Sequence, residues 1–134
     1  MHNEAHKILF AFSPDLDSDF LKDLYGEDLQ QAEAVFESSV QQLRNELLLA
    51  QARFHAGDTA GLKKVVHKMK PLFGYIGLNE IMQQFAAFEE VCVKATSIAE
   101  TEKGFNDITS ITEQAIQKIE KETRRLKQFN TQYL

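Results

Sequence analysis

Residues 62–78, which read LKKVVHKMKPLFGYIGL, contain the most informative pattern in the chain. In a helix that turns by about 100° per residue, six of the apolar side chains in this segment fall on one face. They are Leu62, Val65, Val66, Met69, Phe73 and Ile76. His67 does not belong to this stripe and points away from it. The segment therefore predicts a helix with one buried face and a histidine on the other side.

The surroundings of His67 are basic and uncrowded. No Asp or Glu occurs from residue 59 to residue 79, although the chain as a whole is acidic. Ammonium groups disfavour protonation of a nearby imidazole, and a neutral imidazole is a nucleophile. The residues within two turns that form this basic patch or leave the ring accessible are Lys63, Lys64, Lys70, Pro71 and Gly74. The pattern indicates a surface histidine that accepts a phosphoryl group; the alternative is an ordinary solvated helix face.

Length and composition restrict the class of protein. The chain has 134 residues, which is the size of one domain, and its net charge of −5 argues against a nucleic-acid binder. A single cysteine, Cys92, excludes an internal disulfide and favours a reducing compartment. The apolar run at residues 8–12 is too short to span a membrane. We therefore expect a cytoplasmic, monomeric protein with no nucleic-acid or membrane partner.

Capping and turn residues divide the chain into helices. A short helix should run from Asp17 or Ser18 to Tyr25, and a long one from Asp28 to Gly57. Asp58 or Thr59 should cap the helix that carries His67, and Gly77 should end it. Asn79 should cap the next helix, and after an irregular stretch at residues 95–99 a last helix should reach about Phe129. Gly104 is unfavourable near the start of that last helix, which suggests a later start.

These elements predict an all-α fold, an up-down-up-down four-helix bundle with a short extra N-terminal helix, in one domain spanning residues 1–134. Residues 1–13 should form a loosely held lead-in. His2 and His6 have a spacing that could grip a metal ion in a helix, but in a terminal tail we expect no metal site. Charged residues of the last helix, Glu122 among them, should form a solvated outer face without a function.

Glu89 interrupts the apolar stripe of the fourth helix, between Phe85 and Cys92. A carboxylate in that position needs a partner or must reach the rim of the core. Because His67 and Glu89 each stand eleven residues from Leu78 at the turn, they should lie at equal height in an antiparallel helix pair. Glu89 could then accept a hydrogen bond from one ring nitrogen and leave the other to attack. The alternative is that Glu89 turns outward or pairs with a lysine for packing.

The run His67-Lys68-Met69-Lys70, followed by Gly77, resembles the H-x-x-K-G signature with a later glycine of histidine-containing phosphotransfer (HPt) domains. The resemblance extends over nearly the whole chain. It implies that His67 is phosphorylated, that Lys70 faces the phosphate, and that Glu89 stands where the family carries a Glu or Gln beside the histidine. Pro71 departs from the family, which usually has glycine there, and we expect a local break in the helix at this proline.

The resemblance also implies a function: a phosphocarrier of a multistep two-component phosphorelay. A receiver-domain phosphoaspartate would donate to His67, which would pass the group to another receiver. The partners would be receiver domains of response regulators and hybrid histidine kinases, with Mg²⁺ on the receiver and no cofactor on this chain. Because the chain has no nucleotide loop and no kinase motif, we expect no enzymatic activity of its own. Tyr75, Leu72 and the first helix are candidate docking contacts or core-edge residues.

Two other functions follow from the same residues. An unphosphorylated helical adaptor that binds signalling proteins is the main alternative, and acid-labile phosphate on the protein would distinguish the two. A metal-binding bundle would need Glu-x-x-His pairs on facing helices. No Glu stands three residues before any histidine in this chain, which argues against such a site.

Overall fold

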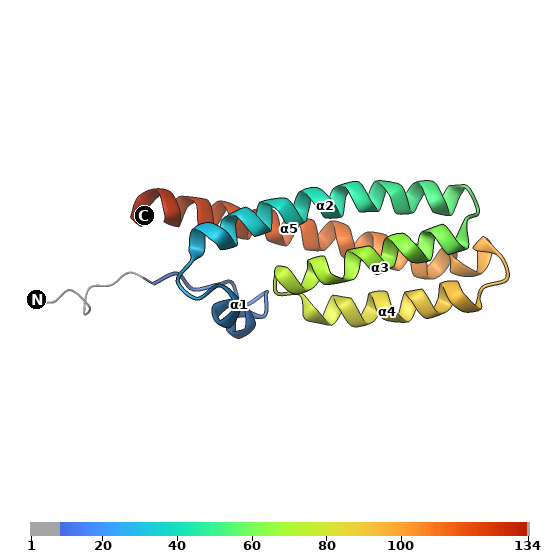
Figure 1. Ribbon diagram of the computed structural model, residues 1–134, viewed down its shortest axis with the longest axis horizontal. Coiled ribbons are helices and arrows are strands. Elements are labelled where there is room, and N and C mark those ends of the chain that lie inside the picture. The colour runs from blue at the N-terminus through green and yellow to red at the C-terminus, as the bar shows by residue number, and fades with distance from the viewer. Residues whose placement is uncertain (1–8, 134) are drawn as a thin grey trace, which may run out of the picture.

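The computed structural model describes residues 9–133, and it consists of helices joined by short connections. The elements are α1 (Ser18–Tyr25), α2 (Leu29–His55), α3 (Thr59–Tyr75), α4 (Asn79–Lys94), the 3₁₀ helix η2 (Ile98–Thr101) and α5 (Glu102–Tyr133). No strand occurs among residues 9–133. Helices α2 to α5 run alternately up and down as a bundle, and α1 lies at the end where α3 turns into α4 (Figure 1). The predicted fold class is confirmed.

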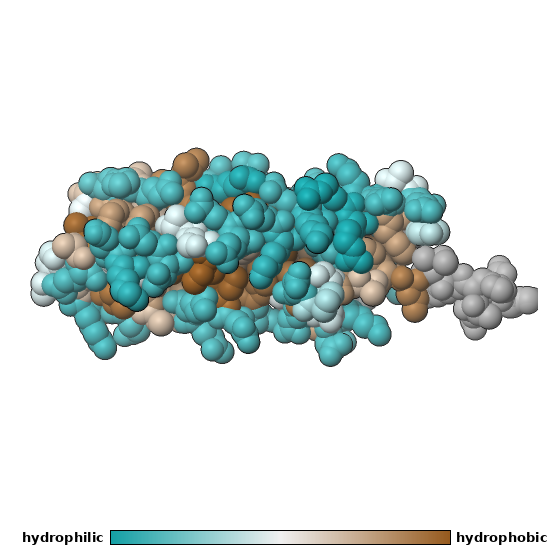
Figure 2. All heavy atoms as spheres, turned by 180° about the vertical axis from the view of Figure 1, so that it is seen from behind, coloured by the Kyte–Doolittle hydropathy of each residue, from teal (hydrophilic) through white to brown (hydrophobic). Residues whose placement is uncertain are grey.

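The core lies along the bundle axis and is built from the predicted apolar stripes. Phe36, Phe73 and Phe85 are fully buried, and each contributes about 1.5–3 kcal/mol by leaving water. Helix α2 packs along α3 and α5, and α3 packs along α4, whereas α4 and α5 contact each other less extensively. Seen from behind, hydrophilic residues cover most of the surface, and hydrophobic residues show in a band along its middle (Figure 2). None of the helices in residues 9–133 combines the length and apolar character of a membrane span.

Side-chain caps begin two of the bundle helices as predicted. The Asp28 carboxylate accepts a hydrogen bond from the Gln31 N–H at 3.0 Å, and Asp58 accepts one from the Gly61 N–H at 2.8 Å. The prediction that Asn79 caps α4 is wrong, because Asn79 is the first residue of that helix. Its amide instead donates to the Asp17 carboxylate at 3.1 Å. This contact ties the start of α1 to the start of α4, so tertiary packing outweighs local capping here.

The segment before α1 is anchored to α5 from Phe10 onward. Phe12 is 8% exposed, and the Ser13 N–H donates to the Glu122 carboxylate at 2.7 Å. Glu122 is only 2% exposed and also forms an ion pair with Arg125. The prediction of a loose lead-in is therefore wrong for residues 10–13, and the prediction of a solvated Glu122 is wrong. A buried carboxylate needs hydrogen-bond partners of this kind. His2 and His6 lie outside the described residues.

Gly104 lies inside α5, two residues after its start, so the expected later start is also wrong. A Cβ atom at this position would come within 2.6 Å of the Phe88 ring of α4. The glycine therefore permits a close approach of the two helices. Its lower helix propensity, which costs about 1 kcal/mol relative to alanine, is outweighed by this packing.

Candidate functional site

His67 lies midway along α3 on the face opposite the core. All six residues of the predicted stripe are buried, and Val66 and Met69 are inaccessible to solvent. The side chain of His67, in contrast, is 70% exposed. The helical period predicted from the sequence thus places the imidazole in water on a rigid element, where a large reaction partner can reach it.

Glu89 of α4 holds the His67 ring. Its Oε1 atom lies 2.8 Å from Nδ1 of His67, and its side chain is only 11% exposed. The equal spacing of the two residues from the α3–α4 turn predicted this hydrogen bond, and it is present. A carboxylate accepts hydrogen bonds, so the contact favours the tautomer that carries its proton on Nδ1. The Nε2 atom then keeps its lone pair available for attack.

Lys70 also binds Glu89. The Lys70 Nζ atom lies 2.9 Å from the second carboxylate oxygen, Oε2, and the lysine side chain is 21% exposed. The Glu89 carboxylate therefore bridges the Lys70 ammonium and the His67 ring. The ammonium binds Glu89 rather than extending into solvent. Glu89 therefore makes the predicted contact with the histidine and also pairs with a lysine, and it does not turn outward.

The other predicted site residues line the exposed surface around the ring. Lys63, Lys64 and Pro71 are exposed, whereas Gly74 is partly buried. A Cβ atom at Gly74 would lie 3.3 Å from the Met82 sulfur, so this glycine also permits α4 to begin close to α3. The break expected at Pro71 is absent, because α3 continues as α-helix to Tyr75. The loss of one backbone hydrogen bond at an exposed position is compatible with a helix held by its buried face.

Cys92 lies one turn after Glu89 and is buried, as expected for a small core residue. Burial raises the pKa of the Cys92 thiol from 9.0 to about 11, with Glu89 adding to the increase and Lys63 opposing it. The thiol is therefore protonated and unreactive at neutral pH. Among residues 9–133, no group of three or more His, Cys, Asp or Glu side chains is placed to hold a metal ion.

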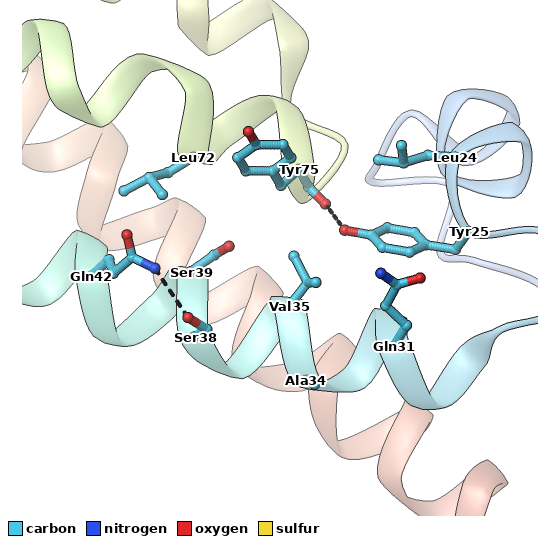
Figure 3. Close-up of a pocket in the computed structure, with 10 residues that line it drawn as sticks. All are labelled: Leu24, Tyr25, Gln31, Ala34, Val35, Ser38, Ser39, Gln42, Leu72 and Tyr75. Atoms are coloured by element: carbon cyan, nitrogen blue, oxygen red, sulfur yellow. Dashed lines mark hydrogen bonds between the residues drawn. The ribbon is translucent and has the colours of Figure 1, made fainter.

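A groove of about 450 Å³ lies between α1, α2 and the end of α3, the helix that carries His67 (Figure 3). At one end the Tyr25 hydroxyl donates to the Tyr75 carbonyl at 2.6 Å, and burial raises the pKa of Tyr25 to about 12. Leu72 is buried in its wall, whereas Tyr75 is 49% exposed. None of the described residues that line the groove has a charged side chain; they are Leu24, Tyr25, Gln31, Ala34, Val35, Ser38, Ser39, Gln42, Leu72 and Tyr75.

Sequence reasoning pointed to Tyr75, Leu72 and the first helix but missed the contribution of α2 to this groove. The available signal was the pair Ala34 and Ser38, which stand four residues apart and are both small. Small side chains on one helix face leave room next to the helix. Their position opposite Leu72, however, depends on how α2 and α3 pack.

Comparison with known proteins agrees with the geometry of the site. The model of the family described as Hpt domain matches residues 21–128, which is most of the chain. No curated protein and no solved structure matched. Hpt domains take part in histidine-containing phosphotransfer in phosphorelays, where they interact with receiver domains. The chain thus combines a bundle of four long helices, an exposed histidine held by a carboxylate, and a family match over most of its length. It belongs to the Hpt domain family of two-component signalling.

Proposed function

We propose that this protein is a phosphocarrier that receives a phosphoryl group on Nε2 of His67 and passes it on. The observation that carries the proposal is the hydrogen bond between His67 and Glu89, combined with the exposure of the ring. A histidine held by one nitrogen presents the other in a fixed direction, which lowers the entropic cost of attack. The donor is the phosphoaspartate of one receiver domain, and the acceptor is the aspartate of another.

The transfer requires one bond to form and one to break. The Nε2 lone pair of His67 forms a bond to phosphorus, and the bond between phosphorus and the aspartyl oxygen breaks, with its electron pair going to the carboxylate. The onward step reverses these changes on a second receiver. In this proposal the receiver brings Mg²⁺, and the lysines beside His67 supply further positive charge toward the phosphoryl oxygens.

The uncharged groove between α1, α2 and α3 is the proposed docking contact for the receiver. Tyr75 at its exposed edge follows His67 by eight residues, which is about 12 Å along the helix axis and about 80° around it. A receiver whose aspartate faces His67 can therefore reach the groove as well. Its uncharged lining favours an apolar side chain of the receiver in this position. We expect the lysines to govern approach and the groove to govern fit.

Exposure to a phosphorylated receiver tests the proposal. The wild-type protein should acquire phosphate that is labile in acid and stable in alkali, and His67→Gln should fold normally and acquire none. Ala34→Arg, which places a long charged side chain in the groove from an exposed position, should weaken receiver binding. Ala52→Arg, at an exposed position of α2 away from the groove, is the matched control. Acid-labile phosphate on the His67→Gln variant would contradict the assignment of His67.

A further inference from the structure

One carboxylate in the site serves two partners. Glu89 accepts from Nδ1 of His67 with Oε1, at 2.8 Å, and from Nζ of Lys70 with Oε2, at 2.9 Å. Because the carboxylate is mostly buried, losing its cationic partner would leave a poorly solvated negative charge. While the ring is neutral, that partner is Lys70. The resting site therefore keeps the lysine on Glu89.

Phosphorylation changes the charge of the ring. When Nε2 of the resting tautomer bonds to phosphorus and Nδ1 keeps its proton, the imidazole becomes a phosphoimidazolium with one positive charge. That charge develops next to Glu89, at the existing 2.8 Å hydrogen bond. The carboxylate thereby gains a second cation just as a dianionic phosphoryl group appears on the opposite ring nitrogen. The phosphoryl group, once the receiver and its Mg²⁺ have left, attracts a further cation from the neighbouring side chains.

We propose that Glu89 exchanges partners during the reaction, holding Lys70 at rest and releasing it to the phosphoryl group when the ring becomes cationic. This inference rests on the proposed phosphorylation of His67. In the phosphorylated state Glu89 pairs with the ring, and Lys70 pairs with the phosphoryl oxygens. Each charge keeps an opposite partner in both states. The lysine is thus delivered only when there is a phosphoryl group to bind.

The geometry allows the exchange without movement of the helices. His67 and Lys70 are three residues apart on one helix, which makes their side chains neighbours on its surface. The Lys70 ammonium and the ring contact the two oxygens of a single carboxylate. A lysine stem has four rotatable bonds, so rotation about them can carry the ammonium from the Glu89 side of the ring to the Nε2 side.

NMR spectroscopy of the ¹⁵N-labelled lysine side chains tests the exchange. Potassium phosphoramidate serves as the donor, because its phosphoryl group can move to Nε2 with release of ammonia and no receiver is needed. The Lys70 ammonium resonance, assigned by its loss in Lys70→Arg, should shift on phosphorylation and correlate with ³¹P. In Glu89→Gln the resting Lys70 resonance should already be that of a mobile lysine. Phosphorylation of this variant should be about tenfold slower, which corresponds to about 1.4 kcal/mol of lost transition-state stabilisation.

Asp107→Asn provides the matched control. Lys103 and Asp107 form an exposed ion pair on α5, with 3.7 Å between Nζ and Oδ2. This variant should release Lys103 without changing the phosphorylation rate or the Lys70 resonance. A phosphorylated wild-type protein whose Lys70 resonance does not move would overturn the exchange alone. A protein that takes up no phosphate on His67 would overturn the proposed function and the exchange with it.

Discussion

Nδ1 of His67 and the carboxylate of Glu89 lie 2.8 Å apart across the α3–α4 interface, although 22 residues separate them in the chain. The short turn between the two helices sets this pairing, because it places residues equidistant from the turn at the same height. The bond holds an otherwise exposed ring in one orientation, and it links the histidine to a carboxylate that is itself mostly buried.

Substitutions of Glu89 should weaken phosphotransfer, and the loss should depend on whether the hydrogen-bond acceptor, the charge or both are removed. Glu89→Ala removes both the hydrogen-bond acceptor and the charge, whereas Glu89→Gln keeps an acceptor and loses only the charge. We therefore expect a larger loss of transfer rate for Ala than for Gln, with His67 exposed in both. Rates of label transfer from a phosphorylated receiver measure this. Glu90→Gln, an exposed neighbour, is the control, and equal rates for all variants would remove Glu89 from the site.

Lys70→Ala should slow transfer and also reduce stability. The lysine stabilises the mostly buried Glu89 carboxylate, and losing a charge-assisted hydrogen bond of this kind costs about 1.5–3 kcal/mol. Lys68→Ala removes an exposed lysine of the same helix and should leave stability unchanged. Urea unfolding combined with transfer assays separates the two effects. An unchanged transfer rate with every receiver tested would show that Lys70 has no part in the reaction.

Gly104→Ala should destabilise the bundle, although alanine is the better helix former. Helix propensity favours the substitution by about 1 kcal/mol. The added Cβ, however, would come within 2.6 Å of the ring of Phe88, which is 3% exposed and cannot move aside easily. Overpacking of this kind costs about 1–3 kcal/mol, so the net change should be unfavourable. Thermal unfolding measures it. In a Phe88→Leu background the cost should shrink, and an equal cost there would mean that this contact is not the cause.

The free energy of unfolding should fall in alkaline solution in two steps. Burial raises the pKa of Cys92 from 9.0 to about 11 and that of Tyr25 from 10.0 to about 12, so the fold favours both neutral forms. For each group, this stabilisation is complete below the pKa of the unfolded chain and is lost as pH rises through the pKa of the folded protein. Urea unfolding from pH 8 to pH 12 measures this loss. Cys92→Ala should flatten the curve between pH 9 and 11 only.

Local periodicity was sufficient to predict the main helices and the exposure of His67. The stripe from Leu62 to Ile76 is buried, and His67 lies off it, because a helix repeats every 3.6 residues whatever surrounds it. The Glu89 contact was also predictable, since a short turn between two helices converts spacing along the chain into height. The family of the chain followed from the residues around His67 and agrees with the match over residues 21–128.

What only the tertiary structure decided are the contacts between residues far apart in the chain. The Ser13 N–H that donates to Glu122 lies 109 residues from it. Glu122 falls on the buried stripe of α5, between Ile119 and Leu126, but no local pattern indicates which donor it meets there. Phe88 determines the need for glycine at position 104, and the packing of α2 against α3 creates the groove. Helix periodicity and capping act within a few residues, whereas burial, close approach and hydrogen-bond partners depend on which helices the folded core brings together.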